Sequence, residues 1–278
     1  MVGRHILFLL LITPALLGAG DSAHALESPW APAQQSAIRL IAAGPTAPGD
    51  PRLKAGIEIK LTPGWHTYWR YPGDAGIPPR FDWRGSENLA GVDVLWPAPE
   101  RILVGGTISI GYERDVIFPL RILPTDPARP VKLSLKLEYA VCAKICIPAE
   151  ARVRLDVPAG GATSVPALIA AEAKVPRRAK LGEVGSLAIT GVRLERGAVS
   201  RVLVTASVPP GSKSDLFAEG PSAEWLLPVP EKLSTEAALV RFVFPLEGAP
   251  TGTAPIPPML RLTLVAGERA IEVDVPLD

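Results

Sequence analysis

The sequence has few of the side chains that bind metal ions or attack substrates. Its 278 residues contain two cysteines, three histidines and two methionines. After the first 25 residues only His66 and Met259 remain to join the cysteines, and zinc or soft-metal sites need several ligands close together. We therefore expect no metal ion and no bound cofactor. A hydrolase of the cysteine–histidine type also lacks support, because no local motif joins His66 to a cysteine.

The chain has no excess of charge of either sign and no long apolar segment after its first residues. Its formal net charge is +1, so nothing in the composition favours nucleic acid or an acidic surface as a partner. No later run reaches the roughly 18 apolar residues of a membrane-spanning helix, and we expect a soluble mature chain. The 31 prolines and 25 glycines accompany 47% hydrophobic residues, which is typical of a folded, loop-rich protein.

Residues 1–25 have the three parts of a secretory signal peptide. Arg4 supplies the positive start, Ile6–Leu17 is a short apolar run, and Ala23–Ala25 is a small-x-small cleavage site. An uncleaved membrane anchor is the alternative, although the run is short for a spanning helix. We predict a mature chain that begins at Leu26 in an oxidising compartment, where a disulfide can form and persist.

Alternation of apolar and polar residues predicts an all-β protein. The alternating runs cover residues 53–61, 116–122, 131–139 and 151–157 in the first half and 187–194, 202–208, 239–244, 260–264 and 271–275 in the second. Turn signals separate them at spacings typical of a β-sandwich. Only Pro166–Lys174 has the composition of a helix, and it is short.

Three short motifs recur in the same order, which predicts two related β-sandwich domains in tandem. Leu95–Arg101 matches Leu226–Lys232, Phe118–Leu120 matches Phe244–Leu246, and Asp156–Pro158 matches Asp274–Pro276. The alternative is that proline-rich turns look alike anywhere. The predicted division is a signal peptide at 1–25, a first domain at 26–160, a linker with a short helix at 161–180 and a second domain at 181–278. The second domain lacks cysteine, and we expect it to be a spacer or a docking module.

The two cysteines, Cys142 and Cys146, are separated by only three residues. Four residue steps along a straight strand cover about 13 Å, whereas the Cα atoms of a disulfide lie about 4.4–6.8 Å apart. Alternating strands flank the pair on both sides. A disulfide therefore requires the chain to fold back, at the tip or flank of a hairpin.

Three roles for this pair remain open. Reversible thiol–disulfide exchange is favoured, because so short a loop contributes little as a staple and because loops at the ends of a sandwich are exposed, as exchange requires. A structural disulfide and a Cu(I) site made of two thiolates are the alternatives. Lys144, between the cysteines, would favour a thiolate at either one, or it is an ordinary solvated charge.

An aromatic segment is the other marked feature, with Trp65, Tyr68, Trp69 and Tyr71 within seven residues. Such a segment packs in a core, or it forms a platform near the cysteines that buries the disulfide or receives a partner. His66 lies within it, and we expect a structural role for that histidine.

Residues 64–158 contain a series of motifs that together resemble one family. The motifs are Gly64–Trp69, Pro72–Pro79, Leu95–Pro99, Gly111–Tyr112 and Tyr139–Glu150, the last of which contains both cysteines. They resemble the N-terminal periplasmic domain of the transmembrane thiol:disulfide reductases of the DsbD and ScsB type. The likeness is closer to the ScsB branch, which is associated with copper tolerance and also spaces its cysteines by three residues.

This resemblance implies immunoglobulin-like sandwiches, a periplasmic location and a redox-active pair at one end of the first domain. It implies that Cys142 and Cys146 cycle between dithiol and disulfide, and that Cys146 forms the mixed disulfide. The activity would be that of a thiol:disulfide oxidoreductase. The electron donor would be a thioredoxin-like domain or a membrane electron transporter, and the acceptors would be disulfide-bonded proteins of the periplasm.

The resemblance also implies a cap, because in the family a short loop covers the disulfide until a partner docks. By order along the chain, Arg101, Ile102 and Leu103 would supply this cap. Glu100 beside them would tune the acidity of the thiols or be a charge at the rim.

Members of the family usually continue into a multi-span membrane domain and a thioredoxin domain, and this sequence contains neither. We therefore expect either a separate membrane protein that supplies the electrons or a stand-alone relay with a changed role. The alternative functions are a copper-tolerance protein that holds Cu(I) with the reduced pair, and a scaffold with a structural disulfide.

Overall fold

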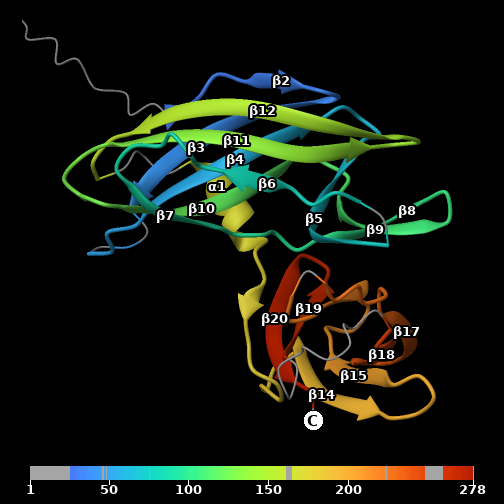
Figure 1. The fold of residues 1–278 in the computed structure, drawn as a ribbon. Coiled ribbons are helices and arrows are strands. Elements are labelled where there is room, and N and C mark those ends of the chain that lie inside the picture. The colour runs from blue at the N-terminus through green and yellow to red at the C-terminus, as the bar shows by residue number, and fades with distance from the viewer. Residues whose placement is uncertain are drawn as a thin grey trace, which may run out of the picture.

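The computed structural model describes residues 26–45, 47, 49–74, 76–160, 165–222, 224–247 and 259–277. These residues form two β-sandwiches in tandem, with one helix between them (Figure 1). The prediction of an all-β chain with two sandwich domains is thus confirmed. The predicted signal peptide lies outside the described residues. Among those residues, no helix has the length and apolar character needed to cross a membrane.

The first domain consists of two sheets that pack face to face. Its strands are β1 (Leu26–Glu27), β2 (Ala31–Ala33), β3 (Ser36–Pro45), β4 (Leu53–Leu61), β5 (His66–Gly73), β6 (Arg80–Asp82), β7 (Leu89–Val94), β8 (Glu100–Val104), β9 (Thr107–Tyr112), β10 (Val116–Pro124), β11 (Val131–Cys142) and β12 (Cys146–Val157). One sheet has the order β1-β3-β4-β10-β7, with β2 beside β3. The other has the order β12-β11-β5-β9-β8, with β6 beside β11.

The second domain is smaller and consists of two four-stranded sheets. Its strands are β13 (Arg177–Arg178), β14 (Ala188–Glu195), β15 (Arg201–Ser207), β16 (Ser214–Glu219), β17 (Glu231–Glu236), β18 (Leu239–Pro245), β19 (Met259–Ala266) and β20 (Arg269–Pro276). The sheet orders are β13-β20-β19-β16 and β14-β15-β18-β17. The strand β13 lies in the segment predicted as linker and pairs in parallel with β20, because the linker runs along an open sheet edge.

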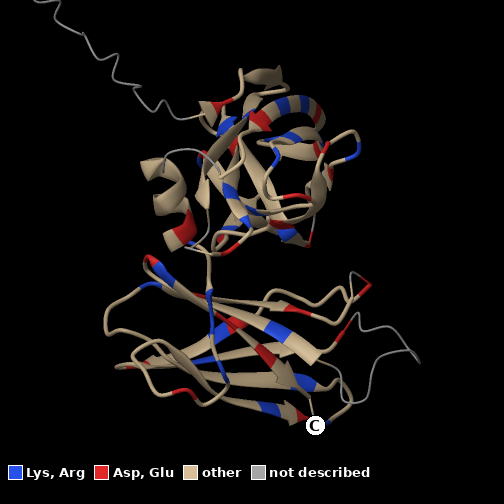
Figure 2. Cartoon of the chain, turned by 90° about the vertical axis from the view of Figure 1, so that its left-hand side faces the viewer, with Lys and Arg blue, Asp and Glu red and all other residues tan. Residues whose placement is uncertain are grey.

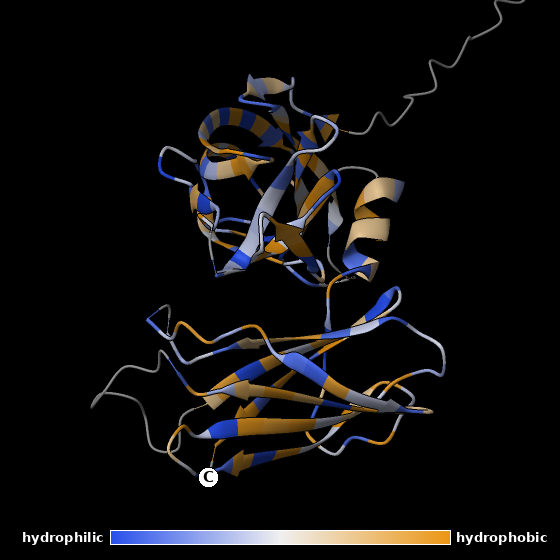
Figure 3. Cartoon of the chain, turned by 90° about the vertical axis from the view of Figure 1, so that its right-hand side faces the viewer, coloured by the Kyte–Doolittle hydropathy of each residue, from blue (hydrophilic) through white to orange (hydrophobic). Residues whose placement is uncertain are grey.

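Alternating burial explains why these segments are strands. In β11, Leu133, Leu135 and Leu137 are buried, whereas Lys132 and Glu138 are exposed. The same alternation of hydrophobic and hydrophilic residues runs along the strands of the second domain (Figure 3). Charges of both signs are interspersed over the two domains (Figure 2), as the near-zero net charge predicts.

Two of the three motifs that recur in the sequence lie at equivalent positions in the two domains. Glu100 opens β8 and Glu231 opens β17, and the other end of the repeat falls in β12 and β20. Phe118, however, lies near the start of β10, whereas Phe244 lies near the end of β18. The repeat therefore follows the hairpins β11–β12 and β19–β20 more closely than the central strands.

The helix α1 (Pro166–Ala173) packs on the outer face of the first sheet. Leu168 is buried in a small cluster with Ile41, with Ile117 packed against it. Gly56 permits this approach, because a Cβ atom there would lie 3.0 Å from a methyl group of Leu168. Glu172 fixes the end of the helix through ion pairs with the strands below it. The helix was predicted from sequence at Pro166–Lys174, and its position is confirmed.

The second domain completes the hydrophobic core of the first at β5. Phe217 on β16 and Val229 belong to the first domain's core cluster. The fully buried ring of Trp69 lies with its centre 6.0 Å from that of Phe217. The two domains thus share buried apolar surface, which stabilises their association.

A polar cluster lies beside this shared core. Arg70 on β5 donates two hydrogen bonds to Glu219, at 2.8 and 2.6 Å, and forms an ion pair with Glu272. Its guanidinium also lies 4.2 Å from the centre of the Trp69 ring. Tyr71 donates its hydroxyl hydrogen to the carbonyl of Leu227. The strand β5 is therefore held by the second domain over three consecutive residues.

Candidate functional site

Cys142 and Cys146 form a disulfide at the tip of the longest hairpin. Cys142 ends β11, Cys146 begins β12, and the two are direct partners in the antiparallel register. Their Cα atoms lie 4.1 Å apart. The chain folds back between them, as the spacing predicted. This end of the first domain also carries the β8–β9 hairpin (right-hand side of Figure 1).

The two sulfur-bearing residues differ in their access to solvent. Cys142 is 1% exposed, whereas Cys146 is exposed, as are Lys144 and Ile145 between them. Residues of β11 alternate between the core and the outer face of the sheet: Val141 lies in the core, and Cys142 lies in an outer cluster with Tyr68 and Ala140. A thiolate from another protein could therefore reach the sulfur of Cys146 and not that of Cys142.

Tyr68 contacts both sulfur atoms. Its hydroxyl donates a hydrogen bond to Sγ of Cys142 at 2.7 Å and lies 3.2 Å from Sγ of Cys146. A side-chain hydrogen bond to Ser109 on β9 also holds this hydroxyl. Burial raises the pKa of Tyr68 above its usual value, so the hydroxyl stays protonated and able to donate at neutral pH. Ser109 was not identified from the sequence, because an isolated serine in a strand carries no signal.

His66 lies opposite Cys142 in the register between β5 and β11. Its ring meets the ring of Tyr68 edge-on, with centres 5.5 Å apart. Its Nε2 atom is buried and has no hydrogen-bond partner among the described residues. Burial lowers the pKa of His66, which favours a neutral ring at pH 7. This placement against Tyr68 fits the structural role expected from the sequence.

The aromatic segment lies mostly in the interior. Tyr68 and Trp69 are 1% and 0% exposed, so both rings are packed inside, and neither offers a surface to a partner protein in this structure. Both faces of β5 are covered at these positions, one by the core and the other by the end of β11 and the loop at Gly76, which alternation alone did not reveal. Trp65 packs against the core, and Tyr71 lies in the domain interface. Tyr68 does help to bury the disulfide.

The residues predicted to form a cap lie on β8, and they point in different directions. Ile102 is 2% exposed, whereas Leu103 is 71% exposed. Arg101 reaches the second domain, where it binds Asp215. Lys144 is exposed at the tip of the cysteine hairpin. Of the predicted set, the register therefore brings only Ile102 into a buried position near the disulfide.

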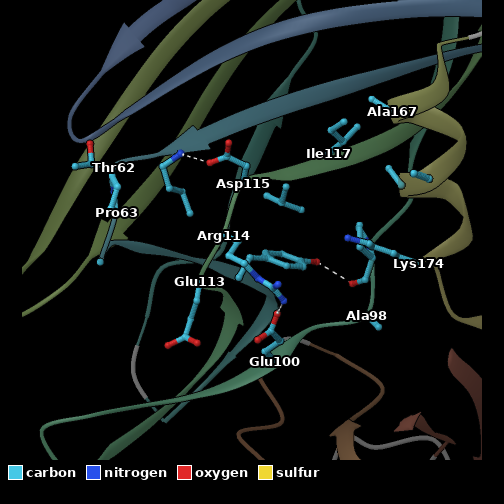
Figure 4. A pocket seen from close by; sticks show the side chains of 17 residues that line it. Thr62, Pro63, Ala98, Glu100, Glu113, Arg114, Asp115, Ile117, Ala167 and Lys174 are labelled. Carbon is cyan, nitrogen blue, oxygen red and sulfur yellow. Dashed lines mark hydrogen bonds and ion pairs between the residues drawn. The ribbon is translucent and has the colours of Figure 1, made fainter. Parts of the chain in front are cut away.

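Glu100 lies at the rim of a separate cleft of about 800 Å³ (Figure 4). Its carboxylate forms an ion pair with Arg114 at 3.1 Å, and both side chains are largely exposed. Neither cysteine lines this cleft, which lies between α1 and the ends of strands β4 and β10. The charge of Glu100 is thus partly neutralised by a neighbour, as expected of a rim residue.

The loop after β5 covers the ring of Tyr68 at Gly76. A Cβ atom built on Gly76 would lie 2.4 Å from Cε1 and 2.5 Å from Cδ1 of Tyr68. Only glycine allows this approach without a shift of the ring. Gly76 was part of the family motif, but its contact with Tyr68 was not predicted.

We expect Gly76→Ala to lower the free energy of unfolding by about 1–3 kcal/mol, because the new methyl group must displace the buried Tyr68 ring. Urea denaturation followed by tryptophan fluorescence measures this change. Gly91→Ala is the matched control, since nothing lies within 4 Å of a Cβ atom at Gly91, and it should change the stability by less than about 0.5 kcal/mol. Equal effects of the two substitutions would contradict the proposed contact.

The described residues contain no group of three or more His, Cys, Asp or Glu side chains that could hold a metal ion. Reduction of the disulfide would leave two thiols, Cys142 buried and Cys146 exposed. The geometry thus offers a pair of sulfur atoms whose accessible member can exchange and whose inner member is stabilised by a hydrogen-bond donor. This arrangement suits thiol–disulfide exchange.

Comparison with known proteins supports this chemistry. Residues 38–158 match the family described as thiol:disulfide interchange protein DsbD, N-terminal. The solved N-terminal periplasmic domain of ScsB from Proteus mirabilis has the same fold, with a TM-score of 0.69 at 20% identity over 91% of this chain and 99% of that chain. No match was found among curated proteins. The matched residues include both strands that carry the cysteines, so this part of the chain is similar to the N-terminal domains of DsbD proteins.

Proposed function

We propose that the protein relays reducing equivalents by thiol–disulfide exchange through Cys142 and Cys146. The observation that carries this proposal is the asymmetry of the pair: Cys146 is exposed at a hairpin tip, while Cys142 is buried with the Tyr68 hydroxyl 2.7 Å from its sulfur. A purely structural disulfide needs neither an accessible sulfur nor a hydrogen-bond donor at the other one.

The first half of the cycle reduces the disulfide. A thiolate of the donor attacks Sγ of Cys146, so that a donor–Cys146 disulfide forms and the Cys142–Cys146 bond breaks. The bonding electron pair leaves with Sγ of Cys142, and the Tyr68 hydroxyl stabilises that thiolate. A second donor thiolate then attacks the donor's own sulfur, which releases Cys146. Two electrons have passed to this protein, and the donor is left with a disulfide.

The second half returns the electrons to an acceptor. The Cys146 thiolate attacks an acceptor disulfide and forms a mixed disulfide, and one acceptor sulfur leaves as a thiolate. Cys142 then attacks Sγ of Cys146, which reforms the internal disulfide and releases the second acceptor thiolate. In the proposed setting the donor is a thioredoxin-like domain or membrane electron transporter, and the acceptors are disulfide-bonded proteins of the periplasm. The likeness to a periplasmic domain supports that location.

Cys142→Ala should form a stable covalent complex with a thioredoxin that keeps one active-site cysteine, activated as a thionitrobenzoate disulfide. Cys146→Ala should react at least about a hundredfold more slowly, because access limits attack by the buried Cys142 thiol. Release of coloured thionitrobenzoate gives the two rates, and non-reducing electrophoresis shows the complex.

Equal, slow reaction of both variants would contradict the exchange function. In that case anaerobic loading with Cu(I) would decide about the copper alternative. One equivalent of copper held by the reduced protein and lost in the double Cys→Ser variant would support metal binding.

A further inference from the structure

The two faces of the hairpin formed by β8 and β9 contact different parts of the first domain. On the inner face of the sheet, Ile110 and Tyr112 belong to the core of the first domain. On the outer face, the register places Ile102 directly opposite Ser109, and Ser109 holds the hydroxyl of Tyr68. The outer face of this hairpin therefore lies against Tyr68, whose hydroxyl contacts the inner sulfur.

Arg101 precedes Ile102 on β8 and points to the other face of the strand, where it reaches the second domain. Arg101 donates from Nε to Asp215 at 3.0 Å and from Nη2 to the other carboxylate oxygen at 2.7 Å. Nη2 also donates to the carbonyl of Pro230 at 2.8 Å. Both charged side chains are about a quarter exposed. A two-armed bond between a guanidinium and a carboxylate fixes orientation as well as distance.

Within the β8–β9 hairpin, β9 is fixed by its pairing with β5, but β8 has few polar contacts outside the hairpin. The turn of the hairpin consists of Gly105 and Gly106, both with positive φ, and Leu103 and Val104 near the turn are exposed. Among the residues that the structure describes, β8 is the edge strand of its sheet, with β9 as its only neighbour there.

Glu100 on β8 pairs with Arg114. Both of those side chains are more exposed than those of Arg101 and Asp215. The bond of Arg101 to Asp215 is therefore the stronger polar restraint on β8 from outside its hairpin.

We infer that Arg101 is a positioning residue: its bond to Asp215 holds the β8–β9 hairpin against Tyr68 and keeps the Cys142 sulfur enclosed. The second domain, which has no cysteine, thereby controls access to the redox pair of the first. The role of this enclosure in controlling electron transfer rests on the proposed exchange function. Release of the bond, by a mutation or by a partner that separates the domains at this point, exposes the Cys142 sulfur.

The reactivity of Cys142 measures this enclosure without any partner protein. In the full chain carrying Cys146→Ala, Cys142 is the only thiol, and its alkylation by iodoacetamide can be followed by mass spectrometry. Adding Asp215→Asn should speed the alkylation about tenfold, since charge-assisted hydrogen bonds to the hairpin are lost. Arg101→Gln should act alike, and the double substitution should add little, because both remove one interaction.

Arg84→Gln is the matched control. Arg84 makes the same two-armed bond with Asp82, but this pair lies on and beside β6, so the alkylation rate should stay at the parent value. Circular dichroism confirms folding, and the rate in urea gives the upper limit. Should Asp215→Asn fail to fold, Arg101→Lys decides, since it keeps the charge but loses the second arm and should give an intermediate rate.

A folded Asp215→Asn or Arg101→Lys variant whose Cys142 reacts no faster than in the parent overturns the positioning role. That result leaves the exchange function intact, because the assay involves no exchange. Conversely, failure of the thioredoxin complex to form would overturn the exchange function and leave the effect of Asp215 on enclosure standing.

Discussion

Tyr68→Phe should slow the reduction of the Cys142–Cys146 disulfide by about 10- to 100-fold. The hydroxyl donates to the sulfur that leaves as a thiolate, at 2.7 Å, and a hydrogen bond to a charged group contributes about 1.5–3 kcal/mol. The ring stays in place, so access to Cys146 should not change. Stopped-flow reduction by dithiothreitol measures the effect. In the Cys146→Ala background, the pH profile of Cys142 alkylation should also move to higher pH.

The profile moves to higher pH because the Tyr68 hydroxyl stabilises the Cys142 thiolate, and without this donor the thiol ionises at a higher pH. The raised pKa of Tyr68 keeps its hydroxyl protonated through the neutral range, so between pH 6 and 9, roughly, only the thiol titrates. Tyr139→Phe is the matched control, because Tyr139 is also buried and its hydroxyl bonds with Ser36, away from the cysteines. If Tyr139→Phe slowed reduction as much as Tyr68→Phe, the loss would reflect general loosening of the domain.

Arg70→Ala should lower the free energy of unfolding by about 3 kcal/mol, because it leaves two largely buried carboxylates without their shared partner. The Arg70 side chain is 20% exposed, and those of Glu219 and Glu272 are 16% and 7% exposed. The substitution also uncovers one face of the Trp69 ring. Urea denaturation followed by tryptophan fluorescence measures the change.

Arg84→Ala gives the comparison for a solvent-exposed pair. Arg84 is 90% exposed, and removing it should change the stability by less than about 0.5 kcal/mol. High salt should leave the Arg70 effect nearly intact, since buried pairs are screened little. A stability loss for Arg70→Ala no larger than that for Arg84→Ala would show that the domain interface does not depend on this cluster.

The strands along which burial alternates were predictable, whereas β3, with four buried residues in a row, was not. Leu53–Leu61 was predicted as a strand and is β4 with the same bounds, and the turn between Cys142 and Cys146 followed from the length of a disulfide. Short edge strands such as β13 were not predicted, because two residues show no period. The strand β8 was not predicted either, since only one of its five residues is buried.

The sequence was enough to predict that the two cysteines form the site, but not how the surrounding residues enclose one of them. Sequence spacing places Cys142 and Cys146 together, but it does not say which one faces the solvent. That depends on the phase of β11 relative to the core, where Val141 points inward and Cys142 outward. The bond between Arg101 and Asp215 joins residues more than a hundred positions apart, and no local pattern signals such a contact.

The central claim is that the Cys142–Cys146 disulfide is reversible under physiological conditions, and its reduction potential tests this most directly. Equilibration of the mature protein in thiol redox buffers, followed by alkylation and mass spectrometry, gives the value. We predict a potential within the range of exchange proteins, about −270 to −120 mV. A potential below about −300 mV would identify a structural disulfide and would contradict the relay function.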